Sequence, residues 1–273
     1  MNKDIRGVLI GMVFGDAYLG VGLRNNGCFR SEMRIVHSIA QKDYCEHKAA
    51  LLRKHLNRHF NVNIGKNGPG GRYKAANFTV SHPYFKQLKR WLYPRGIKTY
   101  TRKALDMITP EGIAMWYMDD GHPRTNTNRD GWIKSVSTDI HTMCSETEAS
   151  IIKDFFSETY GIEFNIRCDP RRPKEKQFFI QANTAASKEF AGLVQPYIIP
   201  SMLYKLAHVA YLDSHERQTP VGECKSCGKV VYEMRRRNLC TSCYSRWHYQ
   251  NIARFRDNRK PSNRGFYKGR VMI

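Results

Sequence analysis

The chain has 273 residues, of which 41% are hydrophobic and 12% aromatic, and this composition excludes a disordered polypeptide. Its 45 Lys and Arg residues outnumber its 24 Asp and Glu residues, leaving a formal net charge of +21. We favour nucleic acid as the partner over an anionic membrane or a basic solubilising surface, because neutralised phosphates release counterions and the sequence has no long apolar helix or lipidation motif.

The first predicted helix carries glycine at every fourth position, at Gly7, Gly11 and Gly15, within an apolar run. Glycine at this spacing gives a helix a bare stripe, which lets a second helix approach closely. The run is short, is interrupted by Asp16 and has no signal-peptide cleavage site. We therefore expect a protein of the bacterial or phage-infected cytoplasm, or of an organelle, that is not secreted.

A second apolar helix is predicted at 112–121. Thr109 is a suitable N-cap for it, and Pro110 suits the first helical position. Asp120 in this segment follows Asp16 by 104 residues, which indicates that the two helices begin equivalent halves of the chain.

The same order of elements follows each of these helices: a polar–apolar alternation typical of a strand, a helical pattern, a second strand and a Phe-x-x-Leu segment. In the first half these segments are 30–36, 44–56, 77–80 and 85–88. In the second half they are 132–138, 151–160, 177–181 and 190–193. The first helical pattern consists of Tyr44, Lys48, Leu51, Leu52, His55 and Leu56. We predict an α+β fold of two pseudo-symmetric αββαββα half-domains with saddle-shaped antiparallel sheets.

We place the first half-domain at 1–105 and the second at 106–213. Beyond them the composition changes, because 214–273 contain 14 Lys and Arg residues against only four Asp and Glu residues. We expect a small zinc-binding module that contacts DNA at 214–257. A basic tail at 258–273 follows it and is expected to be ordered only on nucleic acid, if at all.

Two nine-residue segments, LIGMVFGDA at 9–17 and IAMWYMDDG at 113–121, resemble the LAGLIDADG motif. Together with PSMLYKL at 200–206, they make residues 5–210 similar to the single-chain LAGLIDADG homing endonucleases, here with an appended four-cysteine zinc-binding module. The eighth motif position, which holds the functional acid of that family, is Asp16 in the first motif and Asp120 in the second. The sequence departs from the family pattern at Phe14, Ala17 and Met115. Asp119 is the alternative to Asp120 as the functional acid of the second motif.

Packing of the two motif helices would bring Asp16 and Asp120 together at their C-terminal ends. Two adjacent carboxylates suit a hard divalent cation, Mg²⁺ or alternatively Mn²⁺ or Ca²⁺, which prefers oxygen ligands and relieves their repulsion. The backbone carbonyls of Ala17 and Gly121 are candidate further ligands. Such a site can activate water and stabilise the leaving oxygen of a phosphodiester. The resemblance implies double-strand DNA cleavage across the minor groove that leaves short 3′ overhangs.

Lys98 follows Asp16 by 82 residues, and Lys205 follows Asp120 by 85. The resemblance implies that lysines at these positions line the active centre. An ammonium group there could polarise the water network or offset charge on the phosphorane. The alternative interpretation is that both are surface lysines, or that they only hold phosphates.

The predicted strands carry long side chains that end in hydrogen-bond donors. This pattern is typical of two concave sheets that lie in successive major grooves of double-stranded DNA. Because the halves differ at most of these positions, we expect a monomer with a long asymmetric target. A solvated strand face is the alternative for any single residue. The candidates are Arg24, Arg30, Arg34, Arg72, Lys74, Asn77, Arg124, Arg129, Lys134, Arg167, Arg171, Arg172, Lys176, Gln177 and Gln181.

Two CxxC pairs, Cys224–Cys227 and Cys240–Cys243, are separated by twelve residues. Four thiolates at this spacing predict a closed, tetrahedral, structural zinc site, with free thiols or a redox motif as the alternatives. We expect the metal to supply the folding energy of so small a module. Its candidate DNA contacts are Arg235, Arg236, Arg237, Arg246, Trp247 and Arg254, although a protein–protein role stays open.

The sequence thus predicts a metal-dependent, site-specific DNA endonuclease. An intron maturase that binds intron RNA and a DNA-binding regulator without cleavage activity are the alternatives on the same scaffold. Retention of both acids argues against the regulator. The chain starts with Met1 and lacks the splice-junction residues of an intein, so we expect an intron-encoded or free-standing gene.

Overall fold

The computed structural model describes residues 3–23, 29–67, 71–127, 133–170, 176–213, 222–231, 236–247 and 250. The chain divides into two compact units. The larger unit consists of 1–125 and 135–215, and the smaller of 126–134 and 216–273. The larger unit contains both motif helices and the smaller one contains the paired cysteines.

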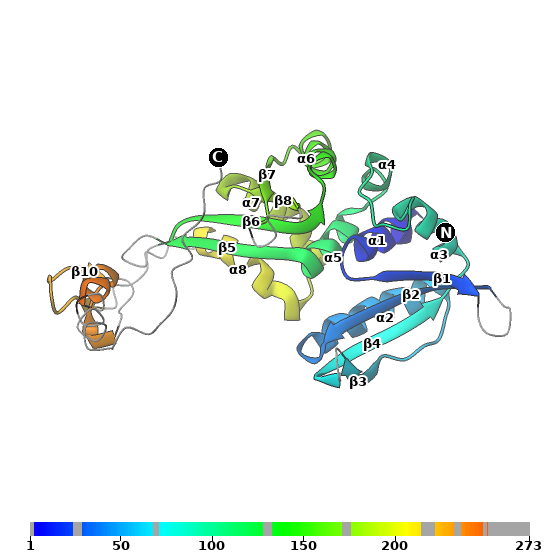
Figure 1. The fold of residues 1–273 in the computed structure, drawn as a ribbon, viewed down its shortest axis with the longest axis horizontal. Coiled ribbons are helices and arrows are strands. Elements are labelled where there is room, and N and C mark those ends of the chain that lie inside the picture. Colours follow the sequence, from blue (N-terminus) through cyan, green and yellow to red (C-terminus); the bar gives the residue numbers. More distant parts are fainter. Residues whose placement is uncertain are drawn as a thin grey trace, which may run out of the picture. The chain divides into compact units, whose positions relative to one another are not determined.

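The first half of the larger unit forms one antiparallel sheet with strand order β1-β2-β4-β3. Helices α2 and α3 both contact β2. The elements, shown in Figure 1, are α1 (Lys3–Phe14), β1 (Tyr18–Leu23), β2 (Phe29–Ser38), α2 (Lys42–Leu56), β3 (Asn63–Asn67), β4 (Tyr73–Ser81) and α3 (Tyr84–Leu92).

The second half repeats this order and has the equivalent strand order β5-β6-β8-β7. After the short helix α4 (Arg102–Leu105), its elements are α5 (Pro110–Asp120), β5 (Gly121–Thr127), β6 (Ile133–Cys144), α6 (Glu146–Tyr160), β7 (Phe164–Cys168), β8 (Phe178–Ala182) and α7 (Thr184–Val194). The unit ends with the 3-10 helix η4 (Pro200–Leu206) and α8 (Ala207–Asp213). The predicted α+β fold of two αββαββα halves is confirmed.

Local sequence signals account for the ends of the second-half helices. The Thr109 side chain accepts a hydrogen bond from the Gly112 backbone N–H at 3.2 Å, and Pro110 is the first residue of α5. Helix α6 begins with a capping box between Ser145 and Glu148. The predicted helix at 112–121 therefore begins two residues earlier, at its capped N-terminus, and ends one residue earlier, at Asp120.

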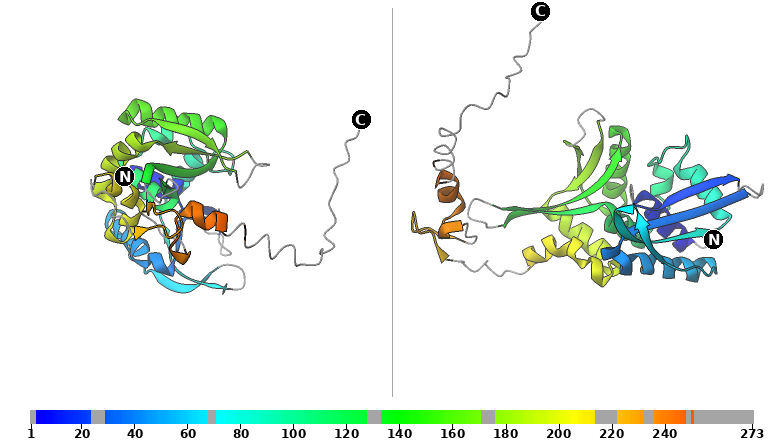
Figure 2. Two further views of the ribbon diagram at one scale, coloured as in Figure 1. Left: turned by 90° about the vertical axis from the view of Figure 1, so that its left-hand side faces the viewer. Right: turned by 60° about the horizontal axis from the view of Figure 1, so that its bottom comes forward.

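Helices α1 and α5 pack against each other at the centre, between the first sheet (blue to cyan) and the second sheet (green) in Figures 1 and 2. Their backbones approach through glycines. A Cβ atom added to Gly11 would lie 1.9 Å from the carbonyl oxygen of Gly112, and one added to Gly112 would lie 2.2 Å from that of Gly7. The glycine stripe expected from the sequence is thus the contact between the two motif helices.

The same central region holds the largest buried aromatic side chains. Phe14 of α1 packs against Tyr100 and Trp116, with ring centroids 4.7 and 5.2 Å away. Tyr117 of α5 packs edge-on against Phe190 of α7, with the ring centroids 5.0 Å apart. Helix α5 is therefore buried nearly all round, which fixes the position of its C-terminal end. None of the helices in the described part of the chain has the length and apolar character that a membrane span requires.

The smaller unit contains a two-stranded antiparallel hairpin of β9 (Gly222–Glu223) and β10 (Val230–Val231), followed by the turn η5 (Arg236–Asn238). Within the described part of this unit, Cys243, Tyr244 and Trp247 pack against a cluster of four buried residues: Cys224, Val231, Leu239 and Cys240. The predicted basic tail, 258–273, lies outside the described residues.

Candidate active centre at the ends of the motif helices

The two motif acids lie at the C-terminal ends of the packed helices. Asp16 follows α1 and its side chain is 50% exposed, whereas Asp120 is the last residue of α5 and is partly buried. Both acids line one cavity of about 610 Å³ together with Lys98 and Tyr100. The structure therefore brings the two sequence-predicted acids to a common cavity.

Burial and mutual repulsion make these acids difficult to ionise. Desolvation raises the pKa of Asp120 to about 7, Lys98 opposes this shift, and the charge of Asp16 adds to it. Desolvation, followed by repulsion from Asp119, also raises the pKa of Asp16. A divalent cation between such carboxylates would relieve the repulsion, and their oxygen atoms are the donors that a hard cation prefers.

The two predicted lysines lie at the helix ends. Lys98 donates to the carbonyl oxygens of Phe14, the last residue of α1, and of Gly15, the residue after it, at 2.8 and 3.2 Å. Lys205, in η4, is 9% exposed and donates to the carbonyl oxygen of Gly121 at 2.6 Å. Desolvation lowers the pKa of both lysines, and the surrounding carboxylates oppose this. Neither side chain is an ordinary surface lysine.

Of the two candidate carbonyl ligands, Gly121 is engaged by Lys205, as its oxygen accepts the Lys205 hydrogen bond. Ala17 is buried, and its backbone N–H donates to the carbonyl of Met12 at 2.9 Å. Both motif acids, Asp16 and Asp120, line the common cavity.

Asp119 forms a buried ion pair that the sequence analysis did not foresee. Both of its carboxylate oxygens accept hydrogen bonds from the Lys48 ammonium group at 2.7 Å, and both side chains are fully buried. The backbone N–H of Asp16 donates to the same carboxylate at 3.0 Å. The Asp119 carboxylate occupies the space left by Gly15, where an added Cβ atom would lie 2.1 Å from it.

His37 completes this buried cluster. Its Nε2 atom lies 3.1 Å from the Lys48 ammonium nitrogen, and its Nδ1 atom lies 3.9 Å from a carboxylate oxygen of Asp16. Desolvation and the charge of Lys48 lower the pKa of His37 to about 4, so the imidazole is neutral at pH 7. Ligand atoms of Asp16, His37 and Asp119 lie within 4.8 Å of one another. The Lys48 ammonium already supplies the positive charge at Asp119.

Three of the predicted DNA contacts share the exposed face of the first sheet. Arg34 pairs with Tyr18 and Thr79 across the sheet, and Val36 pairs with Asn77. Because cross-strand partners share a face and faces alternate along a strand, Arg30, Arg34 and Asn77 lie on one face. Lys74, three residues before Asn77, lies on the opposite face. Arg72 directly precedes β4 and is exposed.

On the second sheet, Asp139 contacts Arg124 and Gln181. Gln181 in turn contacts Arg167. Lys134 is exposed, and alternation places it on the other face from Asp139. Lys176 and Gln177 line the cavity of the two acids. Six further candidates lie outside the described residues, as does the side chain of Arg236: Arg24, Arg129, Arg171, Arg172, Arg235 and Arg254.

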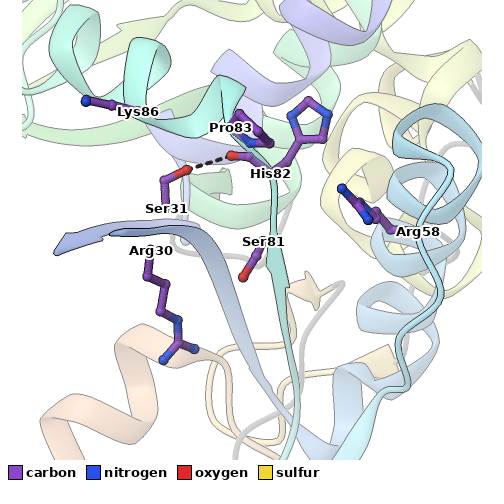
Figure 3. A pocket seen from close by; sticks show the side chains of 7 residues that line it. All are labelled: Arg30, Ser31, Arg58, Ser81, His82, Pro83 and Lys86. Carbon is purple, nitrogen blue, oxygen red and sulfur yellow. Dashed lines mark hydrogen bonds between the residues drawn. The ribbon is translucent and has the colours of Figure 1, made fainter. Parts of the chain in front are cut away.

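A second, basic cavity of about 290 Å³ lies where β2 begins and β4 ends (Figure 3). Arg30, Arg58 and Lys86 contribute positive charge, and none of the seven lining residues is acidic. The Ser31 hydroxyl donates to the carbonyl of His82 at 2.7 Å in its wall. Such a lining suits a phosphate group. Arg58 and Lys86 were absent from the sequence-based set because they lie outside the strand patterns.

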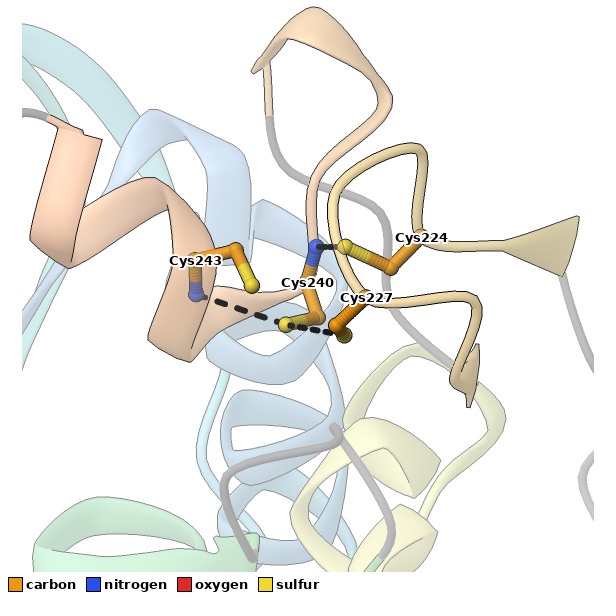
Figure 4. Close-up of side chains that lie close together, drawn as sticks. All are labelled: Cys224, Cys227, Cys240 and Cys243. Atoms are coloured by element: carbon orange, nitrogen blue, oxygen red, sulfur yellow. Dashed lines mark hydrogen bonds between the residues drawn. The ribbon is translucent and has the colours of Figure 1, made fainter.

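The four cysteines of the two CxxC pairs come together in the smaller unit (Figure 4). Their sulfur atoms all lie within 4.8 Å of one another, and those of Cys227 and Cys240 are 3.9 Å apart. The backbone N–H of Cys240 donates to the sulfur of Cys224 at 3.2 Å and lowers the pKa of this thiol. A tetrahedron with metal–sulfur bonds of about 2.3 Å requires sulfur atoms roughly this far apart, so the cluster is compatible with zinc.

Other described residues of this unit bear on the predicted DNA contacts. The guanidinium carbon of Arg237 lies 4.1 Å from the ring centroid of Trp247, which is a cation–π contact. Arg246 is exposed. Outside the cluster, Cys45 and Cys144 are buried free thiols, whereas Cys168 is exposed.

Comparison with known proteins agrees with this geometry. The family model of the LAGLIDADG DNA endonuclease family matches residues 6–190. "Protein RecA" of Mycolicibacterium flavescens is 30% identical over 207 residues, which are 73% of this chain and 45% of that protein. The chain thus spans about half the length of the first curated relatives that it matches.

Two further proteins are similar over a larger share of their own length. "Probable intron-encoded endonuclease 1" of Wickerhamomyces canadensis is 27% identical over 210 residues, which are 76% of this chain and 85% of that protein. Among solved structures, the homing endonuclease I-WcaI bound to its DNA recognition sequence has a TM-score of 0.61 and 24% identity, covering 75% of this chain and 86% of that one. The structural likeness supports the fold.

Proposed function

The chain belongs to the LAGLIDADG DNA endonuclease family, and from this premise we propose that it is a homing endonuclease that cuts both strands of a long asymmetric DNA target. The observation that carries the proposal is the common cavity of Asp16 and Asp120 at the ends of the two packed motif helices. The net charge of +21 supports a polyanionic substrate. Similarity to an intron-encoded endonuclease supports the same reaction class.

In this proposal Asp16 and Asp120 hold the divalent cation, Mg²⁺ or alternatively Mn²⁺ or Ca²⁺. When bound, the cation would supply an activated water and would stabilise the leaving oxygen of the phosphodiester. The chain contributes two carboxylates that stand at the C-terminal ends of the packed motif helices and line one cavity. Each acid would serve the cut in one strand, which leaves short 3′ overhangs.

The lysines offset negative charge next to the acids. Lys98 is fixed through the carbonyls of Phe14 and Gly15, and Lys205 through that of Gly121. An ammonium group has three donors, so each lysine can still offer a hydrogen to a phosphate oxygen. Fixed cations in a partly dry site stabilise developing charge more than mobile surface lysines do. We assign Lys98 and Lys205 this role.

The experiment uses a plasmid library with a randomised target segment, incubated with the protein and Mg²⁺, and reads the cleaved ends by sequencing. We expect a defined long target with short 3′ overhangs for the wild type. Asp16→Ala and Asp120→Ala should abolish cleavage and retain DNA binding in a gel-shift assay. Asp154→Ala, an exposed acid on α6, is the matched control and should cut normally.

Undiminished double-strand cutting by either of the two active-centre variants would defeat the assignment. The maturase alternative predicts tight binding of the cognate intron RNA and splicing support that does not depend on Asp16 or Asp120. An RNA splicing assay with the same two variants separates this alternative from the nuclease. In either case, we infer that zinc in the four-cysteine cluster stabilises the smaller unit, which adds contacts to the nucleic acid.

A further inference from the structure

One buried carboxylate lies on the polar face of the second sheet. Asp139 of β6 is 0% exposed and is paired in register with Gln181 of β8, which in turn is paired with Asn165 of β7. The core of the larger unit lies on the other face, where Ile140 pairs with Ile180. An ionisable group in this position requires polar partners, because an uncompensated buried charge is costly.

Asp139 and those partners form a chain across all four strands of the sheet. The Arg124 Nε atom of β5 lies 2.9 Å from one carboxylate oxygen of Asp139. Gln181 donates through Nε2 to the other carboxylate oxygen at 2.8 Å. The Arg167 Nε–H of β7 donates to the Oε1 atom of Gln181 at 3.1 Å. The order Arg124–Asp139–Gln181–Arg167 therefore joins two outer strands through two inner ones.

The geometry determines which groups can still contact a ligand. Gln181 uses its amide oxygen and one of its two amide N–H donors within the chain, so its main part is to connect Asp139 to Arg167. Arg167 donates a hydrogen bond through Nε, and Arg124 forms an ion pair through Nε without a hydrogen bond, so the terminal NH₂ groups of both lie outside these contacts. The Arg124 side chain is 48% exposed, and Arg167 is also exposed.

Charge argues for base recognition over phosphate binding. Asp139 cancels one of the two positive charges, so the cluster attracts a phosphate less than two unpaired arginines would. What remains is a pair of planar, oriented donor groups. Arginine presenting two N–H donors in this way is the most common partner of the guanine O6 and N7 atoms in the major groove.

We propose that Arg124 and Arg167 read two guanines in the half of the target covered by the second sheet, with Asp139 and Gln181 as positioning residues; this rests on the proposed function. Arg124 lines a cavity of about 450 Å³ with Asp120, so its guanine is the one nearer the cut. The outer strands are three strand spacings apart, roughly 14 Å, which corresponds to about four base-pair steps.

The test is a binding selection with the full-length protein, its zinc retained and no Mg²⁺ added, on DNA randomised over this half of the target. We expect Arg124→Ala to lose the guanine preference at the position nearer the cut and Arg167→Ala to lose it at the other. Each loss should be about 5- to 150-fold in the ratio of guanine to other bases. Arg90→Ala, at an exposed arginine on α3 outside the predicted DNA contacts, is the matched control and should leave both preferences unchanged.

The positioning residues give a second, independent readout. Asp139→Asn keeps the size of the side chain and an acceptor for Gln181 but removes the charge that orients Arg124, so it should relax the first guanine position only. Gln181→Leu should relax the position read by Arg167. Thermal unfolding of both variants shows whether they are folded, because a merely structural defect would weaken binding to all sequences equally.

The outcomes separate this inference from the proposed function. A wild type that selects a defined target, together with arginine variants that lose affinity uniformly for all sequences, would show phosphate contacts and overturn the inference alone. Selection of a target without guanine at either position would do the same. A wild type that selects no sequence would overturn the proposed function together with the inference.

Discussion

Lys48 is a fully buried cation, and its environment explains why it is tolerated. The ammonium group is bound by both oxygens of Asp119 and lies next to His37. Lys48 is the seventh residue of the 15-residue helix α2, and the seventh residue of the 15-residue helix α6 is the buried Ile152. The two halves therefore differ beside the active centre, with a buried ion pair in one and a hydrocarbon side chain in the other.

The first prediction at this scale concerns Lys48→Met. The substitution leaves the Asp119 carboxylate buried and unpaired, so we expect the free energy of unfolding to fall by about 3–5 kcal/mol. Chemical denaturation measures it. Lys54→Met is the matched control on the same helix, because Lys54 is exposed, and its effect should stay within about 0.5 kcal/mol. Equal effects of the two substitutions would contradict the structural role of the pair.

The second prediction concerns Asp120→Asn and pH. The pKa of Asp120 is raised to about 7 from 3.8, so the folded protein binds more protons than the unfolded chain between these values. Stability of the wild type without divalent cations therefore falls as pH rises from about 4 to about 7. Asparagine removes this penalty, so the gain in stability should be small at pH 4.5 and reach at most about 4 kcal/mol at pH 8.

Denaturation of Asp120→Asn and wild type at both pH values, without divalent cations, measures this difference. Asp154→Asn is the control, since Asp154 is exposed on α6 and should show no such pH-dependent gain. An equal effect of Asp120→Asn at both pH values would show that its carboxylate is not destabilised in the folded state. Loss of cleavage together with gain of stability is the pattern expected of a functional residue held under strain.

Single residues of the site were predictable where a motif or a matched offset pointed to them. The motif register indicated Asp16 and Asp120, and the offset from each acid indicated Lys98 and Lys205. Asp119 was considered only as a competitor for Asp120, because the identity of its buried partner depends on the neighbouring helix. Lys48 stood at apolar spacing in the helical pattern, which was the one available signal of its burial.

The elements of the fold follow from local pattern and from one tertiary contact. The strand alternation around 30–36 and 132–138 corresponds to β2 (Phe29–Ser38) and β6 (Ile133–Cys144), each longer than its pattern. The extra residues pair with other strands, and a short sequence window contains no information about such partners. The glycine stripe of α1 was predictable because its spacing specifies a bare helix face, and α5 meets that face.

This contact gives the prediction at the scale of the element. Gly11→Ala should destabilise the protein by at least about 2 kcal/mol, because its Cβ atom would lie 1.9 Å from a backbone oxygen that cannot move without moving α5. Gly192→Ala, in α7, is the matched control. No atom lies within 4 Å of its added Cβ, so it should stabilise the helix by about 0.5–1 kcal/mol.

Thermal unfolding of the two glycine variants measures the opposite signs. The Gly11→Ala variant should also lose cleavage beyond its loss of stability, because separation of the helix ends moves Asp16 away from Asp120. A stabilised or unaffected Gly11→Ala variant would mean that the motif helices do not pack backbone to backbone.

At the scale of the whole molecule, each of the two units has its own signal in the sequence. The repeat of elements over the first 213 residues made the large unit predictable, since both halves satisfy the same pattern. The cysteine spacing likewise predicted the cluster of Cys224, Cys227, Cys240 and Cys243. The proposed roles of Arg124 and Arg167 in base recognition could not be derived from the sequence, because their contacts with Asp139 and Gln181 form only in the folded sheet.

The last prediction concerns removal of the zinc proposed for the four-cysteine cluster. Among the described residues of the smaller unit, four form its buried core, so without metal we expect this unit to unfold while the melting of the larger unit stays unchanged. Because 214–273 carry a net charge of +10, DNA affinity should fall, and the slope of log affinity against log salt should decrease by about 0.9 for each phosphate that the protein no longer neutralises.

Binding is measured without Mg²⁺ for protein as purified, for Cys227→Ser/Cys243→Ser, and after chelation followed by return of Zn²⁺. An unchanged salt slope in the double variant would show that the smaller unit does not bind DNA, whereas recovery with Zn²⁺ alone identifies the metal that folds it.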